Sequence, residues 1–352
     1  MKIGVWGAGR IGCALVRRLA TTPFTSEIVW ANRSVNSMES VAIDVEQSLA
    51  FAPTCRRVSR HVEARAQTEL QTCDVVVVTH GAGVSRNGAR AQLYPENARI
   101  LRERAIPALR GFHGIVLVVT NPVDSLARLV REETGLPEQR VLGLGTVVET
   151  ARLRAILSGL LIPRIPARDL WAFVVGTHDE NFVEIIPERF GAGAFIPRRE
   201  LDELLPCIRE GIQRSAERIK ATGDNNGLRE ALRDALEQVR AAGLNARMHE
   251  PVQLVVQRAE AAIEGAGTCQ PIVEGVVQVI ESIAFDRHAT LTVSTRDPEV
   301  DEYYSVPCTV GGVGILARRV ELLDQPGVVE RLGRCIASLR AVRGATDPRA
   351  TA

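Results

Sequence analysis

The sequence predicts an α/β protein in which helices cover both faces of a doubly wound parallel sheet. Residues 2–6 have the pattern of a short buried strand and run directly into a glycine-rich turn at residues 7–12. Residues 73–79 contain four consecutive valines, typical of a central parallel strand buried on both faces. Strand and helix patterns alternate over roughly the first 145 residues, as such a sheet requires.

The glycine-rich turn has the pattern GxGxxG, with a strand before it and a helical pattern after it. Gly7 permits the tight turn, Gly9 allows backbone to approach a pyrophosphate, and Gly12 allows close packing of the helix on the strand. Residues 13–20 have helical character, and the N-terminus of this helix, next to Arg10 and Ile11, offers free N–H groups and a positive dipole end to phosphates. We therefore expect these five residues to bind a dinucleotide in a Rossmann-type domain. The alternative is a glycine turn with a purely structural role.

The second strand, residues 27–31, indicates which dinucleotide is bound. An NAD-binding protein usually carries Asp or Glu at the end of this strand, to accept hydrogen bonds from the adenosine ribose. This chain has Asn32, Arg33 and Ser34 there. Without the carboxylate a 2′-phosphate is not repelled, and the guanidinium and hydroxyl can bind it. These residues predict NADP in preference to NAD; the alternative is a solvated turn.

A second glycine-rich loop, residues 80–90, follows the valine strand. Small residues let backbone lie against a cofactor, so we expect Thr79, Gly81 and Ala82 to contact it. Two arginines, Arg86 and Arg90, can close over an anionic substrate if the loop moves. Taken alone, the two arginines are better explained as solvated loop charges.

The remaining elements continue the alternation. Strand 114–119 ends in Asn121-Pro122, which places an amide at the carboxyl edge of the sheet, where α/β proteins bind ligands. The other expected helices are 37–49, 93–109, 272–283 and 328–342, and the other expected strands are 141–144, 289–294 and 303–310.

The chemistry is concentrated between residues 147 and 181. Glu149 and Arg152 are three residues apart and share a helix face, and His178 follows an apolar strand. A carboxylate, a guanidinium and an imidazole together can hold a 2-oxo or 2-hydroxy acid and move its proton. Each also has a simpler explanation: an intrahelical ion pair for the first two, and a hydrogen-bonded loop histidine for the third.

The composition excludes several classes of function. The 43 basic and 42 acidic residues nearly cancel, and aromatic residues make up 4%, which argues against nucleic acid as a partner. The seven cysteines are widely spaced, with no metal-ligand pattern, so we expect reduced thiols and no metal. No signal peptide or membrane-length apolar run is present, so we expect a cytoplasmic protein.

Taken in order, these motifs resemble the lactate/malate dehydrogenase family from Met1 to roughly Val342. The resemblance rests on five segments: residues 7–12, 83–86, 121–124, 145–154 and 176–178. It implies a Rossmann domain at residues 1–145 and an α+β substrate domain at 146–343. A helical insertion around 205–245 and a disordered tail at 344–352 complete the predicted organisation.

The resemblance also implies roles for individual residues. His178 is the expected acid/base, oriented by the carboxylate of Glu149. Arg152 is expected to grip the substrate carboxylate, and Arg90 to polarise the carbonyl. Arg86 falls where malate-type enzymes bind the distal carboxylate. Three further residues are expected to line the substrate and nicotinamide site: Asn121, Thr268 and Ile272.

Four departures from the family pattern predict a specialised member. Glu149 replaces an aspartate, Asp179 replaces a glycine, the loop between Arg86 and Arg90 is two residues shorter, and the helical insertion is extra.

The expected protein is thus an NADP-dependent, malate-type oxidoreductase that is a homodimer or homotetramer. The alternatives are a reductase of another carbonyl or imine with the same fold, and a catalytically silent nucleotide-binding regulatory protein.

Overall fold

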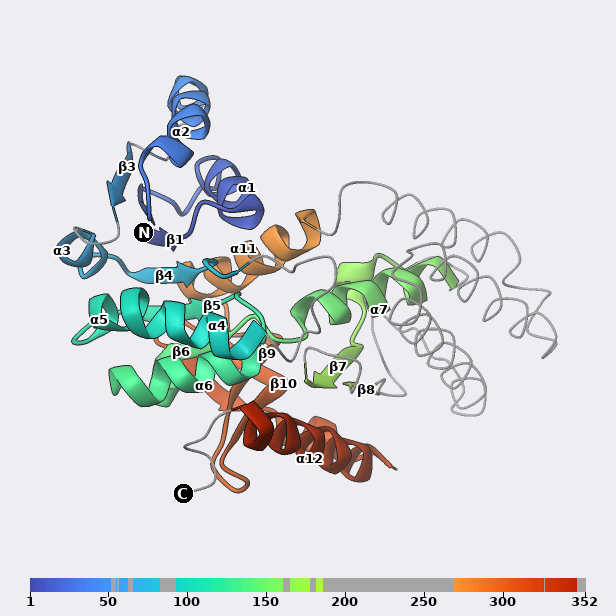
Figure 1. Cartoon of the computed structure of the whole chain (residues 1–352). Coiled ribbons are helices and arrows are strands. Elements are labelled where there is room, and N and C mark those ends of the chain that lie inside the picture. Colours follow the sequence, from blue (N-terminus) through green and yellow to red (C-terminus); the bar gives the residue numbers. More distant parts are fainter. Residues whose placement is uncertain are drawn as a thin grey trace, which may run out of the picture. The chain divides into compact units, whose positions relative to one another are not determined.

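The structure is a computed structural model that describes residues 1–51, 55, 57–62, 66–82, 93–160, 165–177, 182–185, 269–325 and 327–346 (Figure 1). The predicted helical insertion at 205–245 lies outside these residues. The described chain divides into two compact units. The first comprises Met1–Val148, Val175–Val183 and Cys269–Ala352, and the second comprises Glu149–Val174 and Glu184–Thr268.

The described strands form one sheet whose first six members are parallel. The sheet order is β3-β2-β1-β4-β5-β6-β9-β10-β7-β8, with β11 paired to β10. The parallel strands are β1 (Lys2–Trp6), β2 (Glu27–Asn32), β3 (Arg57–Val62), β4 (Val75–Val78), β5 (Ile115–Val118) and β6 (Val141–Gly143). The later strands are β7 (Phe173–Gly176), β8 (Phe182–Ile185), β9 (Ala289–Asp297), β10 (Glu302–Gly311) and β11 (Gly314–Arg318). The predicted parallel α/β sheet is confirmed.

The helices correspond closely to the predicted ones. They are α1 (Arg10–Leu19), α2 (Asn36–Ser48), α3 (Gln67–Leu70), α4 (Leu93–Ile100), α5 (Ile106–Leu109), α6 (Val123–Thr134), α7 (Val147–Leu160), α11 (Gln270–Ala284) and α12 (Val328–Thr346). The helix expected at 93–109 contains a π-helical segment, Leu101–Ala105, between α4 and α5. The last helix continues to Thr346, four residues beyond its expected end.

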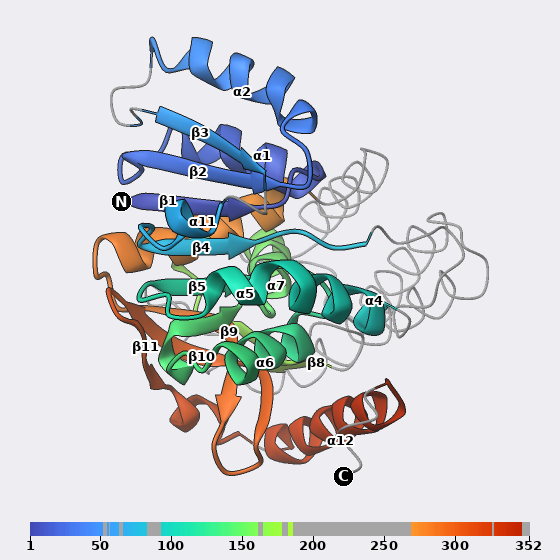
Figure 2. The same ribbon diagram turned by 60° about the vertical axis from the view of Figure 1, so that its left-hand side comes forward.

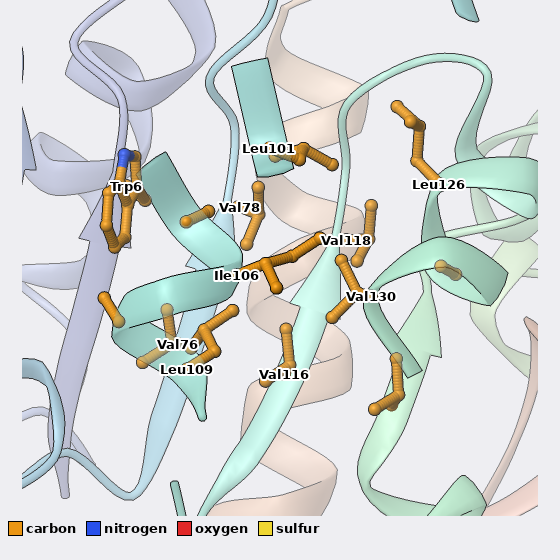
Figure 3. Close-up of a cluster of buried hydrophobic side chains, with 14 of the residues drawn as sticks. Trp6, Val76, Val78, Leu101, Ile106, Leu109, Val116, Val118, Leu126 and Val130 are labelled. Atoms are coloured by element: carbon orange, nitrogen blue, oxygen red, sulfur yellow. The ribbon is translucent and has the colours of Figure 1, made fainter. Parts of the chain in front are cut away.

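Alternation along the central strands builds the core on one face of the sheet. Figure 2 shows the parallel strands side by side, with α4, α5 and α6 on one face and α1 and α11 on the other. Val76 and Val78 of β4 join Val116 and Val118 of β5 in a buried cluster against these helices (Figure 3). Burying each of these side chains contributes about 1.5–3 kcal/mol.

The sheet continues past β6 into the C-terminal strands. Gly143 pairs with Ser294 of β9 in the antiparallel direction, and β9 pairs along its whole length with β10. Ser305 of β10 in turn pairs with Gly176 of β7. Strands that are distant in the sequence therefore meet next to the carboxyl end of the parallel sheet.

The described residues of the second unit are joined by local hydrogen bonds. Thr150 Oγ1 accepts the N–H of Val174 at 2.9 Å, and Arg154 Nε donates to Ala172 O at 2.9 Å. The Arg154 guanidinium also lies over the Phe173 ring. Burial lowers the pKa of Arg154 to about 10. These contacts fix α7 against the start of β7.

Candidate active site

The glycine-rich turn between β1 and α1 is fixed by backbone contacts that exclude side chains. Gly7 has φ +121°, and its N–H donates to Ala31 O at 2.8 Å. A Cβ on Gly12 would lie 2.9 Å from the carbonyl carbon of Gly7 and closer still to its oxygen. Trp30 Nε1 donates to that oxygen at 2.9 Å. Gly7 and Gly12 are therefore needed for the fold itself.

Gly9 is different from its two neighbours in the motif. A Cβ built on Gly9 would meet no atom of the described residues within 4 Å, and Gly9 is exposed at the N-cap of α1. No side chain in the described part of the chain caps this helix, and its first turn, Arg10–Cys13, holds no acidic residue. The N-terminus of α1 thus presents a positive dipole end to open space, which fits a pyrophosphate.

The end of β2 forms a turn held by its own polar side chains. Asn32 Nδ2 donates to Ser37 Oγ at 2.6 Å, and that hydroxyl donates to Ser34 O at 2.8 Å. Arg33 and Ser34 are exposed. The turn contains no carboxylate, and its guanidinium and hydroxyl face solvent, where a phosphate can reach them.

The loops after β4 and β5 are joined by Asn97 of α4, which sequence reasoning missed. Its Oδ1 accepts the N–H of Ala82 at 2.6 Å, and its Nδ2 donates to Asn121 O at 2.7 Å. The side chain is 2% exposed. Gly81 packs against the same amide, since a Cβ there would lie 3.1 Å from Asn97 Oδ1. One buried amide therefore holds two loops that carry predicted cofactor residues.

Thr79 connects these loops to the glycine-rich turn. Its Oγ1 donates to Trp6 O at 3.0 Å and lies 2.8 Å from the Cβ position of Gly7. The predicted cofactor residues that follow β1, β2, β4 and β5 thus all lie at the carboxyl ends of the parallel strands.

The turn that leads into α7 packs closely against atoms of β9 and β10. Gly145 has φ +57°, and a Cβ there would lie 2.7 Å from Ser294 N. The N–H of Thr146 donates to Ser305 Oγ at 3.1 Å and to Thr292 O at 3.2 Å. Ser305 is completely buried. Its hydroxyl is the second feature missed from sequence, since it acts across 159 positions of chain.

Glu149 and Arg152 on α7 form an ion pair, with Arg152 Nη1 3.2 Å from Glu149 Oε1. The arginine side chain is 49% exposed and the glutamate 13%. This contact uses a single guanidinium nitrogen. The remaining N–H groups of Arg152 are geometrically suited to a second carboxylate.

Ile272 lies half-buried in the first turn of α11. Four other predicted site residues lie outside the described residues: His178, Arg86, Arg90 and Thr268. Among the described residues, no group of three His, Cys, Asp or Glu side chains could hold a metal ion. Within the same residues, no helix combines the length and the apolar character that a membrane span requires.

Comparisons with known proteins agree with this geometry. Residues 1–143 match the family model described as lactate/malate dehydrogenase, NAD binding domain. Malate dehydrogenase of Chlorobium luteolum is 30% identical over 224 residues, which cover 63% of this chain and 68% of that protein. L-lactate dehydrogenase of Fervidobacterium nodosum is 32% identical over 185 residues, or 52% of this chain and 57% of that protein. This chain thus spans little more than half the length of that relative.

A solved structure resembles the whole chain. The crystal structure of a lactate dehydrogenase from a Medee basin deep-sea metagenome library has a TM-score of 0.74 and 22% identity, and the match covers 98% of both chains. At this identity the likeness establishes the fold.

Proposed function

Since the chain belongs to the lactate/malate dehydrogenase family, we propose that it is a nicotinamide-dependent oxidoreductase of 2-oxo and 2-hydroxy acids. The observation that carries this proposal is the open N-terminus of α1. Gly7 and Gly12 shape the turn, while Gly9 leaves room for a ligand against the backbone. Residues 1–145 are the proposed cofactor domain, and residues 146–343 the substrate domain.

The proposed chemistry assigns one task to each side chain. A bound reduced nicotinamide supplies the hydride. His178, as imidazolium, donates its proton to the oxygen of the substrate carbonyl and takes it back in the oxidation direction. Glu149 orients the ring and stabilises its charged form. Arg152 binds the substrate carboxylate through two parallel N–H groups, and Asn121 donates to the reacting oxygen.

The loop residues set the substrate class in this proposal. Arg86 binds the distal carboxylate of a malate-like acid, and Arg90 polarises the carbonyl when the loop closes. Thr268 and Ile272 line the pocket beside the nicotinamide. Soluble, cytoplasmic homodimers or homotetramers are the proposed assembly, which light scattering tests directly.

The first experiment is cofactor oxidation by the purified protein with oxaloacetate and with pyruvate, using NADPH and NADH in parallel. Turnover of oxaloacetate that is lost in His178→Ala supports the proposal. Turnover that persists in this variant contradicts the acid/base assignment. Cofactor binding without turnover of either acid indicates a different acceptor, and bulkier oxo acids and imines are then the substrates to test.

The proposed preference for NADPH rests on Arg33 and Ser34. Arg33→Ala removes a charge-assisted contact to the 2′-phosphate, so NADPH binding should weaken about tenfold or more, while NADH binding stays the same. Arg57→Ala is the matched control, because Arg57 is an equally exposed arginine at the opposite end of the adjacent strand β3. Equal losses for both cofactors in Arg33→Ala would rule out the phosphate contact.

The ion pair within α7 favours a second candidate function. Arg152 already has a carboxylate partner at 3.2 Å in its own helix, so a purely structural role for this pair is compatible with a nucleotide-binding protein without dehydrogenase activity. In that case NADPH binds, no oxo acid is reduced, and neither His178→Ala nor Arg152→Ala changes any property of the protein except its stability.

A further inference from the structure

Helices α1 and α11 pack side by side and run in the same direction (Figures 1 and 2). Three contacts that follow the same order along both segments establish this direction. In order, they are Cys269 Sγ to Arg10 O at 3.8 Å, Arg18 Nε to Glu274 Oε1 at 2.8 Å, and the Phe24 and Phe285 rings edge to face at 6.0 Å. The two helix N-termini therefore meet beside the glycine-rich turn.

Each helix carries a cysteine at this meeting point. Cys13 lies in the first turn of α1, and its Sγ donates to Ala8 O at 3.3 Å. Cys269 is the N-cap residue of α11, and its Sγ reaches Arg10 O. Arg18 and Glu274 follow their cysteines by the same number of residues, so the thiols occupy matching positions along the two helices. Both thiols bind carbonyls of the same short stretch, residues 8–10.

These two thiols also differ from the other described cysteines in their access to solvent. Cys13 and Cys269 are partly exposed, whereas Cys55, Cys73, Cys308 and Cys335 are buried. Burial raises the pKa of Cys13; Arg17 offsets part of this effect and the nearby Cys269 adds to it. Cys13 is therefore protonated at neutral pH, and disulfide exchange at this site should accelerate as pH rises.

We propose that Cys13 and Cys269 form a reversible intramolecular disulfide that joins α11 to the cofactor-binding turn. The oxidant is a small disulfide such as oxidised glutathione. One protein thiolate attacks it and releases the first glutathione thiolate, and the second protein thiolate then attacks the mixed disulfide and releases the other. Two protein thiols are oxidised, one small disulfide is reduced, and the two protons end on the two glutathione thiols.

Closing this bond should weaken cofactor binding, a consequence that rests on the proposed function. The Cys13 sulfur, once bonded to Cys269, no longer donates to Ala8 O, so the backbone between Gly7 and Gly9 loses a contact that holds it. That backbone is the proposed pyrophosphate site. Linkage is reciprocal, so a bound dinucleotide must oppose the disulfide by the same factor.

The oxidation site is tested on the full chain, first reduced with dithiothreitol and then incubated with oxidised glutathione. Wild-type protein should lose two free thiols, yield a linked peptide that contains Cys13 and Cys269, and recover both thiols with dithiothreitol. In Cys13→Ser and Cys269→Ser the remaining thiol should instead carry glutathione. Cys207→Ser is the control and should behave as wild type. A disulfide between chains, or one from Cys13 or Cys269 to Cys207, would overturn the proposal.

The coupling is tested by titrating NADP⁺ into the reduced and oxidised proteins. The oxidised form should bind about tenfold more weakly, within the usual range of allosteric coupling. Saturating NADP⁺ should shift the equilibrium in glutathione buffers toward the dithiol by the same factor. If the disulfide forms and affinity is unchanged, the coupling is refuted. If NADP⁺ binds neither form, the proposed function fails while the disulfide site stands.

Discussion

The turns that lead into α1 and α7 use the same local device for different purposes. Each places a glycine with positive φ just before the helix: Gly7 at +121° and Gly145 at +57°. Before α1, the next glycine, Gly9, opens onto empty space. Before α7, the N–H of Thr146 is taken by Ser305 and by a β9 carbonyl.

The charges of the two helices follow the same division. The first turn of α7 contains Glu149, which complements the positive end of the helix dipole. The first turn of α1 contains no acid, and no side chain of the described ranges caps it. The positive end of α7 is thus complemented by groups of the protein itself, and this helix carries the predicted catalytic side chains. The positive end of α1 is left for an external anion. Five substitutions test this contrast.

The largest effect is expected from Gly12→Ala and Gly145→Ala, which should be equally damaging in the two turns. Both place a Cβ less than 3.0 Å from backbone atoms, and Gly145→Ala also forces a side chain into the left-handed region. Each should lower the free energy of unfolding by about 3 kcal/mol or more, measured by urea denaturation. An unchanged midpoint for either would show that the turn can relax.

Gly9→Ala should separate ligand binding from folding. No atom that the structure describes lies within 4 Å of the new Cβ, so the free energy of unfolding should stay within about 0.5 kcal/mol of wild type. NADPH affinity, measured by fluorescence titration, should fall at least about tenfold because the methyl group occupies the pyrophosphate position. Gly333→Ala is the control: it is also exposed with open space around it, lies in α12, and should leave affinity unchanged. Normal NADPH affinity in Gly9→Ala would contradict a pyrophosphate site at this turn.

Ser305→Ala should show that the second turn depends on an internal partner. The substitution removes the Oγ acceptor of Thr146 and should cost about 1 kcal/mol of unfolding free energy. Ser294→Ala is the matched control, because Ser294 is the cross-strand neighbour of Ser305 and is equally buried. Its Oγ makes no hydrogen bond among the described residues, so this variant should be neutral or slightly more stable. If Ser294→Ala lowered the free energy of unfolding more than Ser305→Ala, the role given to Ser305 would be contradicted.

The smallest stability effect is expected from Arg152→Ala. The Arg152 side chain is half exposed, and an intrahelical ion pair at this spacing contributes at most about 0.5 kcal/mol. Urea denaturation should therefore barely change, while turnover of a 2-oxo acid should be lost. A large loss of stability would place this arginine among the residues that hold the fold.

The sequence was sufficient for features that depend on local sterics. The turn at residues 7–12 was predicted because its glycines have the spacing of a dinucleotide-binding turn between a strand and a helix, and Gly7 and Gly12 stand where a side chain has no room. The four valines of β4 were predicted as a central strand because burial on both faces requires continuous apolar character. Fold class follows from such short-range patterns.

Features that depend on distant contacts were missed. Strand β3, residues 57–62, alternates polar and apolar residues only weakly, and its Arg60 forms ion pairs with Glu39 and Glu46 of α2, at 3.8 and 3.2 Å. Asn97 lies in a helical segment whose local sequence gives no sign that this residue is important. Its role comes from its hydrogen bonds to two loops. Ser305 likewise becomes informative only when β10 is seen under the start of α7. A buried polar residue within an apolar pattern is the one signal that could have identified them.

The contrast between Gly12 and Gly9 also provides a way to sort natural relatives of this protein. A descendant that no longer binds a dinucleotide still has to pack α1 against the Gly7 carbonyl, so it remains obliged to keep Gly12. It is under no such obligation at Gly9, where any small side chain fits an empty turn. In a comparison of relatives, a glycine at the position of Gly12 therefore indicates that the fold is kept, whereas a glycine at the position of Gly9 indicates that dinucleotide binding is kept.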